Sequence, residues 1–173
     1  MSPGTGTIRP ATSGDRSGIL AVVADAFSFG GTRDAAEELA IVRATWEAAG
    51  DRMELVAEER GAVVGHLQAA PGRLDGTASA VVGVAPVCVA SSRHGRGIGT
   101  ALITTLFDDA AASQVPLLVL LGDPAYYGRF GFEPAGPLGL HYAPAGVDNA
   151  SFQARLLPGY DAALRGEFSY CWE

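Results

Sequence analysis

An apolar strand that runs through a glycine-rich turn directly into a helix is the feature that most constrains this chain. Residues 78–89 are apolar and rich in β-branched side chains, which predicts a strand buried on both faces. Residues 93–99 hold three alternating glycines, and apolar residues then recur every four positions from Ile98 to Ala110, as in a helix. Glycines let the backbone approach a ligand, and a helix start carries a partial positive charge. The segment therefore predicts an anion site suited to a pyrophosphate.

The remaining apolar patterns predict a mixed α/β sheet in one domain. Helical spacing occurs in residues 19–27 and 39–46, and strand patterns occur in residues 7–10, 53–59, 62–70, 115–121 and 151–157. The helix after the glycine turn is expected to form the crossover between the strands at 78–89 and 115–121. Pro86 cannot donate to a strand ladder, so its strand is expected to bulge or to part from a neighbour there.

The rest of the chain is expected to be turns, loops and a tail. Residues 59–61 indicate a hairpin turn. Residues 71–76 and 133–150, the latter rich in Pro and Gly, are expected to be loops. Residues 1–6 are predicted to be a flexible N-terminal tail, and residues 7–173 the single domain.

Composition excludes several classes of protein. The 173 residues are 48% hydrophobic and 18% charged, which excludes a disordered chain, and no apolar run is long enough to span a membrane. The net charge of −7 argues against nucleic-acid binding, and the absence of lysine excludes a Walker A nucleotide site. The first residues lack the basic and apolar segments of a signal peptide, so a cytoplasmic protein is expected. Cys88, Cys171 and the three histidines are too scattered for a metal site or a disulfide framework.

The glycine-rich turn allows three interpretations. It can simply tighten the corner between a strand and a helix. It can bind a dinucleotide, although Gly95, Gly97 and Gly99 give the spacing G-x-G-x-G where a Rossmann fold needs G-x-G-x-x-G. The third interpretation is a loop that binds the pyrophosphate of coenzyme A.

Two segments together resemble a known family. Residues 94–99, His-Gly-Arg-Gly-Ile-Gly, resemble the signature Q/R-x-x-G-x-G/A of the GCN5-related N-acetyltransferases, the GNAT superfamily, with His94 in place of Gln or Arg. Residues 122–132, Gly-Asp-Pro-Ala-Tyr-Tyr-Gly-Arg-Phe-Gly-Phe, are similar to the family's Y-x-x-x-G-F ending, with Tyr127 at the tyrosine position. The longer string resembles the bacterial YhbS-like group of predicted acetyltransferases within this family.

The resemblance implies a GNAT acetyltransferase domain whose two central strands splay apart to admit acetyl-CoA. The backbone of Val87, Cys88 and Val89 would pair with the pantetheine arm, and the Val89 amide would hold the thioester oxygen. The expected cofactor-binding set is completed by Tyr127 and the residues of the glycine turn, which are His94, Gly95, Arg96, Gly97, Ile98, Gly99 and Thr100. Acetyl-CoA is expected as co-substrate, without a metal.

The implied reaction is direct transfer of the acetyl group to a primary amine of a small molecule or a protein. Tyr127 would be the general acid that protonates the leaving thiolate. One alternative is a GNAT-fold module that binds or senses coenzyme A without turnover, and another is a transferase for oxygen acceptors or longer acyl chains. A homodimer is expected from the resemblance alone, and neither nucleic acid nor a membrane is an expected partner.

The sequence leaves the roles of several residues open. Glu54 and His66 could serve as a general base or be ordinary residues of two strands. Asp123 could belong to the site or cap a short helix that begins at Pro124. Three further candidates could border the coenzyme or the acceptor, namely Tyr126, Arg129 and His141. Cys88 is expected to be inert in its buried strand, rather than a nucleophile that carries the acetyl group.

Overall fold

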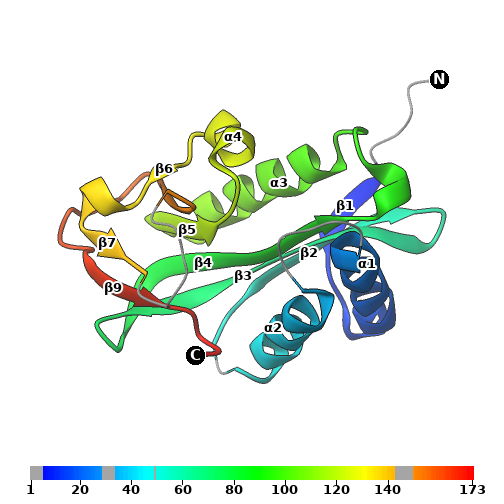
Figure 1. The fold of residues 1–173 in the computed structure, drawn as a ribbon, viewed down its shortest axis with the longest axis horizontal. Coiled ribbons are helices and arrows are strands. Elements are labelled where there is room, and N and C mark those ends of the chain that lie inside the picture. The colour runs from blue at the N-terminus through cyan, green and yellow to red at the C-terminus, as the bar shows by residue number, and fades with distance from the viewer. Residues whose placement is uncertain (1–5, 29–33, 49, 143–149) are drawn as a thin grey trace. The chain divides into compact units, whose positions relative to one another are not determined.

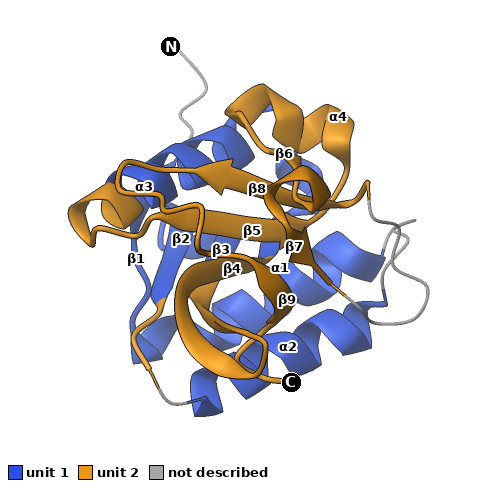
Figure 2. Cartoon of the chain, turned by 90° about the vertical axis from the view of Figure 1, so that its left-hand side faces the viewer, with its two compact units in different colours: residues 1–48, 53–68, 86–108 blue, residues 49–52, 69–85, 109–173 orange. Residues whose placement is uncertain are grey.

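The computed structural model describes residues 6–28, 34–48, 50–142 and 150–173. The chain forms two compact units, which are coloured separately in Figure 2. Unit 1 comprises residues 1–48, 53–68 and 86–108, and unit 2 comprises residues 49–52, 69–85 and 109–173. The expected N-terminal tail lies outside the described residues except for Gly6.

The described residues form four α-helices and nine strands. Figure 1 labels all of them except β8, which is labelled in Figure 2. The helices are α1 (Arg16–Ser28), α2 (Ala35–Glu47), α3 (Ile98–Ala112) and α4 (Pro124–Tyr127). The strands are β1 (Thr7–Pro10), β2 (Met53–Glu59), β3 (Ala62–Leu74), β4 (Thr77–Val89), β5 (Leu117–Leu121), β6 (Glu133–Pro134), β7 (Leu140–His141), β8 (Phe152–Leu156) and β9 (Gly166–Ser169). Their main hydrogen-bonded order is β1-β2-β3-β4-β5-β8-β6.

The sheet is mixed, as the sequence predicts. Strands β4 and β5 are parallel and are connected through α3, whereas β5 and β8 are antiparallel. The paired residues of β4 and β5 run from Val81 opposite Leu117 to Val84 opposite Leu120. This pairing ends before Pro86, in agreement with the separation predicted from a proline that lacks an N–H group. The predicted mixed α/β fold and its crossover helix are confirmed.

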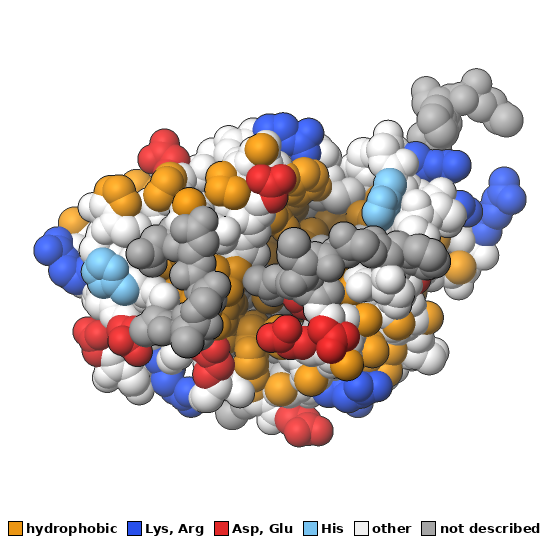
Figure 3. Space-filling view, in the orientation of Figure 1, with side chains coloured by type: hydrophobic (Ala, Val, Ile, Leu, Met, Phe, Trp, Pro, Cys, Tyr) orange, Lys and Arg blue, Asp and Glu red, His pale blue; other side chains and the backbone are white. Residues whose placement is uncertain are grey.

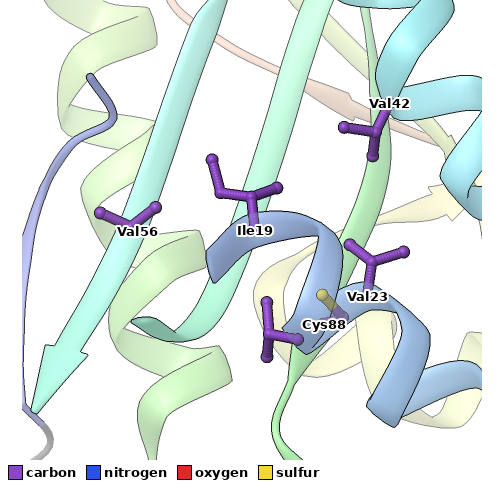
Figure 4. Close-up of a cluster of buried hydrophobic side chains, with 6 residues drawn as sticks. Ile19, Val23, Val42, Val56 and Cys88 are labelled. Carbon is purple, nitrogen blue, oxygen red and sulfur yellow. The ribbon is translucent and has the colours of Figure 1, made fainter. Parts of the chain in front are cut away.

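Unit 1 packs α1 and α2 against one face of its strands. A buried apolar cluster joins three residues of α1 to one residue each of α2, β2 and β4, namely Ile19, Val22, Val23, Val42, Val56 and Cys88 (Figure 4). The α1 members recur at helical spacing, so they lie on one side of the helix. Helix α3 packs on the strands at Gly65, where an added Cβ would lie 3.0 Å from Ile98 and 3.2 Å from Leu102. A side chain at this position would force α3 and β3 apart.

The N-terminal corner of unit 1 is held by Arg9 of β1. Its guanidinium donates to both carboxylate oxygens of Asp15 at 2.8 Å and to Glu58 of β2 at 2.7 Å. Asp15 also accepts from the Thr12 backbone N–H at 2.7 Å, just before α1 begins. The hydrogen bonds from Arg9 hold the pKa of Asp15 well below its usual range. One arginine thereby connects β1, β2 and the start of α1.

Unit 2 contains structure where loops are expected. β3 continues beyond residue 70 to Leu74, and Asp75 and Gly76 form a tight turn with φ of 49° and 75°. Two residues with positive φ between antiparallel strands are typical of a type I′ hairpin. The end of β3 also pairs with β9, with Arg73 opposite Ser169. The expected loop at 71–76 is therefore wrong, because an Asp-Gly turn and a distant strand extend β3.

The expected loop at residues 133–150 is also partly ordered. Its described part contains β6, a 3-10 turn at Gly136–Leu138 and β7, while residues 143–149 lie outside the described residues. β6 pairs with β8, and β7 pairs with β9. Each short strand is stabilised by a partner further along the chain, which local composition does not reveal.

Candidate active site

The glycine turn adopts a backbone that its glycines make possible. β4 ends at Val89, a 3-10 turn covers Ser91–Arg93, and α3 begins at Ile98. Gly95 and Gly97 have φ of 74° and 79°, in the left-handed region that residues with a Cβ rarely adopt. An added Cβ on Gly95 would meet no atom within 4 Å, so the requirement there is conformational rather than steric.

This turn has the features of an anion site. Residues 94–97 are exposed, and they lead into α3, a 15-residue helix whose first turn carries no acidic side chain. The first N–H groups of a helix have no partner within it and carry a partial positive charge. The residues present therefore fit the pyrophosphate of coenzyme A, and its binding at this turn stays a prediction.

Three side-chain contacts within unit 1 anchor the turn. Asp25 of α1 accepts from the Ser91 backbone N–H at 2.6 Å and from the Ser91 hydroxyl at 3.1 Å. Arg93 forms an ion pair with Glu59 of β2 at 2.7 Å. The role of Asp25 escapes sequence analysis, because nothing in the sequence relates α1 to a turn 66 residues later.

His94 occupies the signature position at which this chain departs from the family pattern. Its Nε2 lies 3.0 Å from the carbonyl oxygen of Val89 and donates a hydrogen bond to it. The side chain thus closes the turn back onto the end of β4.

Cys88 has the environment of a structural cysteine. It is buried in the apolar cluster, whereas the neighbouring Val87 and Val89 are partly exposed. Burial raises the pKa of Cys88 to about 12, so the thiol stays protonated at neutral pH. A protonated thiol is a poor nucleophile, which agrees with the expectation that Cys88 is inert.

Tyr127 lies at the end of α4 in unit 2. Asp123 caps this helix by accepting from the Ala125 backbone N–H at 2.9 Å, and Pro124 occupies the first helical position. The structure therefore shows Asp123 in its capping role. The partly exposed ring of Tyr127 passes so close to Gly122 that an added Cβ would lie 2.3 Å from it. Gly122 thus makes room for the predicted general acid.

Four of the other open candidates have local partners, namely Tyr126, Arg129, Glu54 and His66. The Arg129 guanidinium lies 4.5 Å from the centre of the Tyr126 ring and donates to the Tyr126 carbonyl at 3.2 Å. His141 is an exposed residue of β7. Glu54 and His66 are in contact with each other within unit 1, with 3.1 Å between Glu54 Oε1 and His66 Nε2.

The structure assigns the predicted residues to different units. Residues 87–100 belong to unit 1, and Tyr127 belongs to unit 2.

Among the described residues, no group of three or more His, Cys, Asp or Glu side chains is arranged to hold a metal, and no helix is long and apolar enough to cross a membrane. Acidic and basic side chains both occur on the face shown in Figure 3.

Comparison with known proteins identifies relatives of this chain. It is 34% identical over 109 residues to the uncharacterized N-acetyltransferase YhbS of Escherichia coli K12, an alignment that covers 63% of this chain and 64% of YhbS. The chain thus spans just under two thirds of that relative's length. An uncharacterized N-acetyltransferase of Streptomyces avermitilis is 34% identical over 87 residues, which are 50% of this chain and 20% of that protein.

Solved structures give the same result over most of the chain. The E. coli YhbS structure in complex with CoA matches with a TM-score of 0.82 and 29% identity, covering 95% of this chain and 88% of that one. A GNAT family acetyltransferase from Brucella melitensis in complex with acetyl-CoA matches with a TM-score of 0.75 and 29% identity, covering 96% and 97%. The family model for the acetyltransferase (GNAT) domain matches residues 7–135. With the glycine turn, the mixed sheet and these matches in agreement, the chain belongs to the GNAT acetyltransferase family.

Proposed function

We propose that this protein is an N-acetyltransferase that moves the acetyl group of acetyl-CoA directly to a primary amine. The observation that carries the proposal is the exposed glycine turn, with left-handed Gly95 and Gly97 at the start of α3. The two similar structures that hold CoA or acetyl-CoA support the same cofactor for this chain.

In this proposal, unit 1 binds the coenzyme mainly through its backbone. Residues 95–100 hold the pyrophosphate with their N–H groups, and His94 maintains the turn through its hydrogen bond to Val89. The backbone of residues 87–89 pairs with the pantetheine arm. The Val89 amide stabilises the negative charge that develops on the thioester oxygen, an effect worth about 3 kcal/mol in comparable sites.

The chemistry then requires one new bond and one leaving group. A neutral amine nitrogen attacks the thioester carbonyl carbon, and the carbon–sulfur bond breaks to release the thiolate. Tyr127 donates its phenolic proton to the departing sulfur. The amide nitrogen loses its extra proton and the tyrosine is reprotonated, so the products are the acetylated amine and free coenzyme A.

The first experiment measures thiol release from acetyl-CoA with a panel of alkylamines, diamines and amino acids, alongside calorimetric binding of coenzyme A. Tyr127→Phe removes the hydroxyl and retains the ring. We expect amine-dependent thiol release by the wild type that falls at least ~10-fold in the variant, with coenzyme binding unchanged. An equal rate in the variant contradicts the role of Tyr127.

Two other outcomes would change the proposal. Coenzyme binding without transfer to any amine would favour the alternative of a binding or sensing module. Absence of coenzyme binding would contradict the assignment of the glycine turn itself.

A further inference from the structure

A cluster of three buried polar residues in unit 1 lies outside the glycine turn. It consists of Glu54 of β2 with His66 and Gln68 of β3. The side chains of His66 and Gln68 are fully buried, and that of Glu54 is 11% exposed. Residues two apart on a strand face the same way, so His66 and Gln68 lie on one face of β3. Three adjacent polar residues in an apolar layer call for a physical explanation.

The hydrogen bonds of Glu54 determine the form of the imidazole. Glu54 Oε1 accepts from the indole N–H of Trp46 at 2.8 Å and lies 3.1 Å from His66 Nε2. An ionised carboxylate can only accept hydrogen bonds, so Nε2 must carry a hydrogen and donate it. In the neutral imidazole, Nδ1 is then the atom with a free lone pair. Glu54 therefore orients His66 as a carboxylate orients the histidine of a proton-transfer dyad.

The lone pair of Nδ1 is buried together with other polar atoms. Among the described residues, His66 Nδ1 and both amide atoms of Gln68 have no hydrogen-bond partner. More than nine tenths of buried polar groups in proteins are paired, and an unpaired one costs about 1–3 kcal/mol. His66 Nδ1 and the Gln68 side-chain oxygen are acceptors, and the Gln68 amide nitrogen is a donor. On one strand face, these atoms can together bind a water molecule, which needs two to four polar partners.

This polar cluster lies beside the strand segment that we propose for the pantetheine arm. The backbone of His66 hydrogen-bonds to the thiol of Cys88, and the Ala90 N–H donates to the Val64 carbonyl at 2.8 Å. His66 is thus adjacent to the middle of residues 87–89. The charges of Glu38 and Asp25 also act on the Cys88 thiol.

We propose that His66 accepts the proton of the acceptor's ammonium group through a water bound by Nδ1 and Gln68, and that Glu54 is its positioning residue. This inference rests on the proposed function, because it supplies the base that an alkylamine needs. Such an amine has a pKa near ~10 and is protonated at neutral pH. A nitrogen–hydrogen bond of the ammonium group breaks, and its electron pair stays on the amine. The water takes that proton and passes one of its own to Nδ1, so the imidazolium pairs with Glu54 and later releases the proton to solvent.

The kinetic test uses Glu54→Gln and His66→Gln. In Glu54→Gln the side-chain oxygen can still accept from Trp46 and His66, so only the charge that stabilises the imidazolium is lost. For the best alkylamine of the panel, we expect kcat/KM at pH 7 to fall about 100-fold in His66→Gln and about 10-fold in Glu54→Gln. Both deficits should shrink as the pH rises toward the amine pKa, because solvent then supplies the neutral amine.

A second acceptor and a control variant separate this role from a structural one. Methoxyamine is already neutral at pH 7 and needs no base. With methoxyamine as acceptor, kcat/KM of His66→Gln and of Glu54→Gln should therefore fall less than about 5-fold. Thr45→Val is the control, because Thr45 is buried on α2 and its hydroxyl donates only to the Ile41 carbonyl of the same helix. It should keep the wild-type pH profile. Equal losses of His66→Gln with both acceptors, or a rate equal to the wild type with the alkylamine, overturn the proposal.

An independent readout needs no turnover. Long-range ¹H–¹⁵N NMR spectra of the wild type distinguish the two imidazole tautomers, with His66→Gln identifying the signal. We expect the form with hydrogen on Nε2 at pH 8, and the form with hydrogen on Nδ1 overturns the proposal. If the wild type acetylates amines while these tests fail, the proposed function stands without this base. If the wild type itself acetylates no amine, both proposals fail together.

Discussion

At the scale of single residues, the position of the Tyr127 ring depends on the absence of a side chain at Gly122. An added Cβ would lie 2.3 Å and 2.6 Å from two ring carbons, closer than packed carbon atoms approach. Gly122→Ala therefore has to displace the proposed general acid. We expect its turnover to fall about as far as that of Tyr127→Phe, at least ~10-fold, with little change in coenzyme binding.

Gly128 provides a matched control in the same segment. Its backbone has helical φ and ψ, and an added Cβ there would meet no atom within 4 Å. Gly128→Ala should therefore retain wild-type turnover. Steady-state kinetics of both alanine variants test the argument, and a fully active Gly122→Ala would show that the ring position does not matter for catalysis.

At the scale of elements, Asp25 connects α1 to the glycine turn. It accepts two hydrogen bonds from Ser91, and Asp25→Asn can keep only one of them because an amide nitrogen does not accept. Hydrogen bonds to charged groups contribute about 1.5–3 kcal/mol, and ~1.4 kcal/mol is a factor of ten in affinity. We expect the dissociation constant of coenzyme A, measured by calorimetry, to rise about 10-fold.

A charge-matched variant separates the loss of the hydrogen bond to Ser91 from the loss of a negative charge. Asp108→Asn removes the same charge from an exposed position on α3. Coenzyme A is an anion, so losing a negative charge alone should strengthen its binding slightly in either variant. Weaker binding by Asp25→Asn but not by Asp108→Asn supports the anchoring role, and equal behaviour of the two contradicts it.

The corner formed by β1, β2 and the start of α1 should make stability depend on pH. Because Arg9 lowers the pKa of Asp15, this contact stabilises the folded state fully above the ordinary aspartate pKa of about 4, and the contribution is lost as the pH falls below it. Arg9→Met should therefore destabilise the protein at pH 7, with a difference from wild type that shrinks between about pH 4 and pH 2. Urea unfolding of both proteins at several pH values measures this difference in the free energy of unfolding. Arg43→Met, at an exposed position on α2, should show no such convergence.

Elements encoded by local patterns could be predicted from the sequence. The strand at 78–89, the helix from Ile98 and the strand at 115–121 correspond to β4, α3 and β5. The end of β3 could not, because it depends on Arg73 pairing with Ser169 far along the chain. The same limit applies to the site. Glycine spacing indicated the turn, but only the folded chain brings Asp25 to Ser91 and Glu54 to His66.

At the scale of the whole molecule, the net charge of −7 bears on the choice of acceptor. A negative protein attracts cations over a distance set by the Debye length, about 10 Å at 0.1 M salt, so salt weakens this attraction. The effect grows with the charge of the acceptor. For 1,4-diaminobutane, a dication, kcat/KM should therefore fall about 3-fold or more between 20 and 300 mM salt, and less for the monocation 4-amino-1-butanol.

These two probes have the same chain length and one amine in common, so their comparison removes salt effects on coenzyme binding. A steeper decline for the dication would support a cationic acceptor selected by the field of the protein. Identical salt dependence would mean that the acidic composition serves solubility and that contacts at the site alone select the acceptor. The distinction matters because a negative charge spread over the chain acts on every cation, whereas Glu54 and His66 act only on an amine that has reached them.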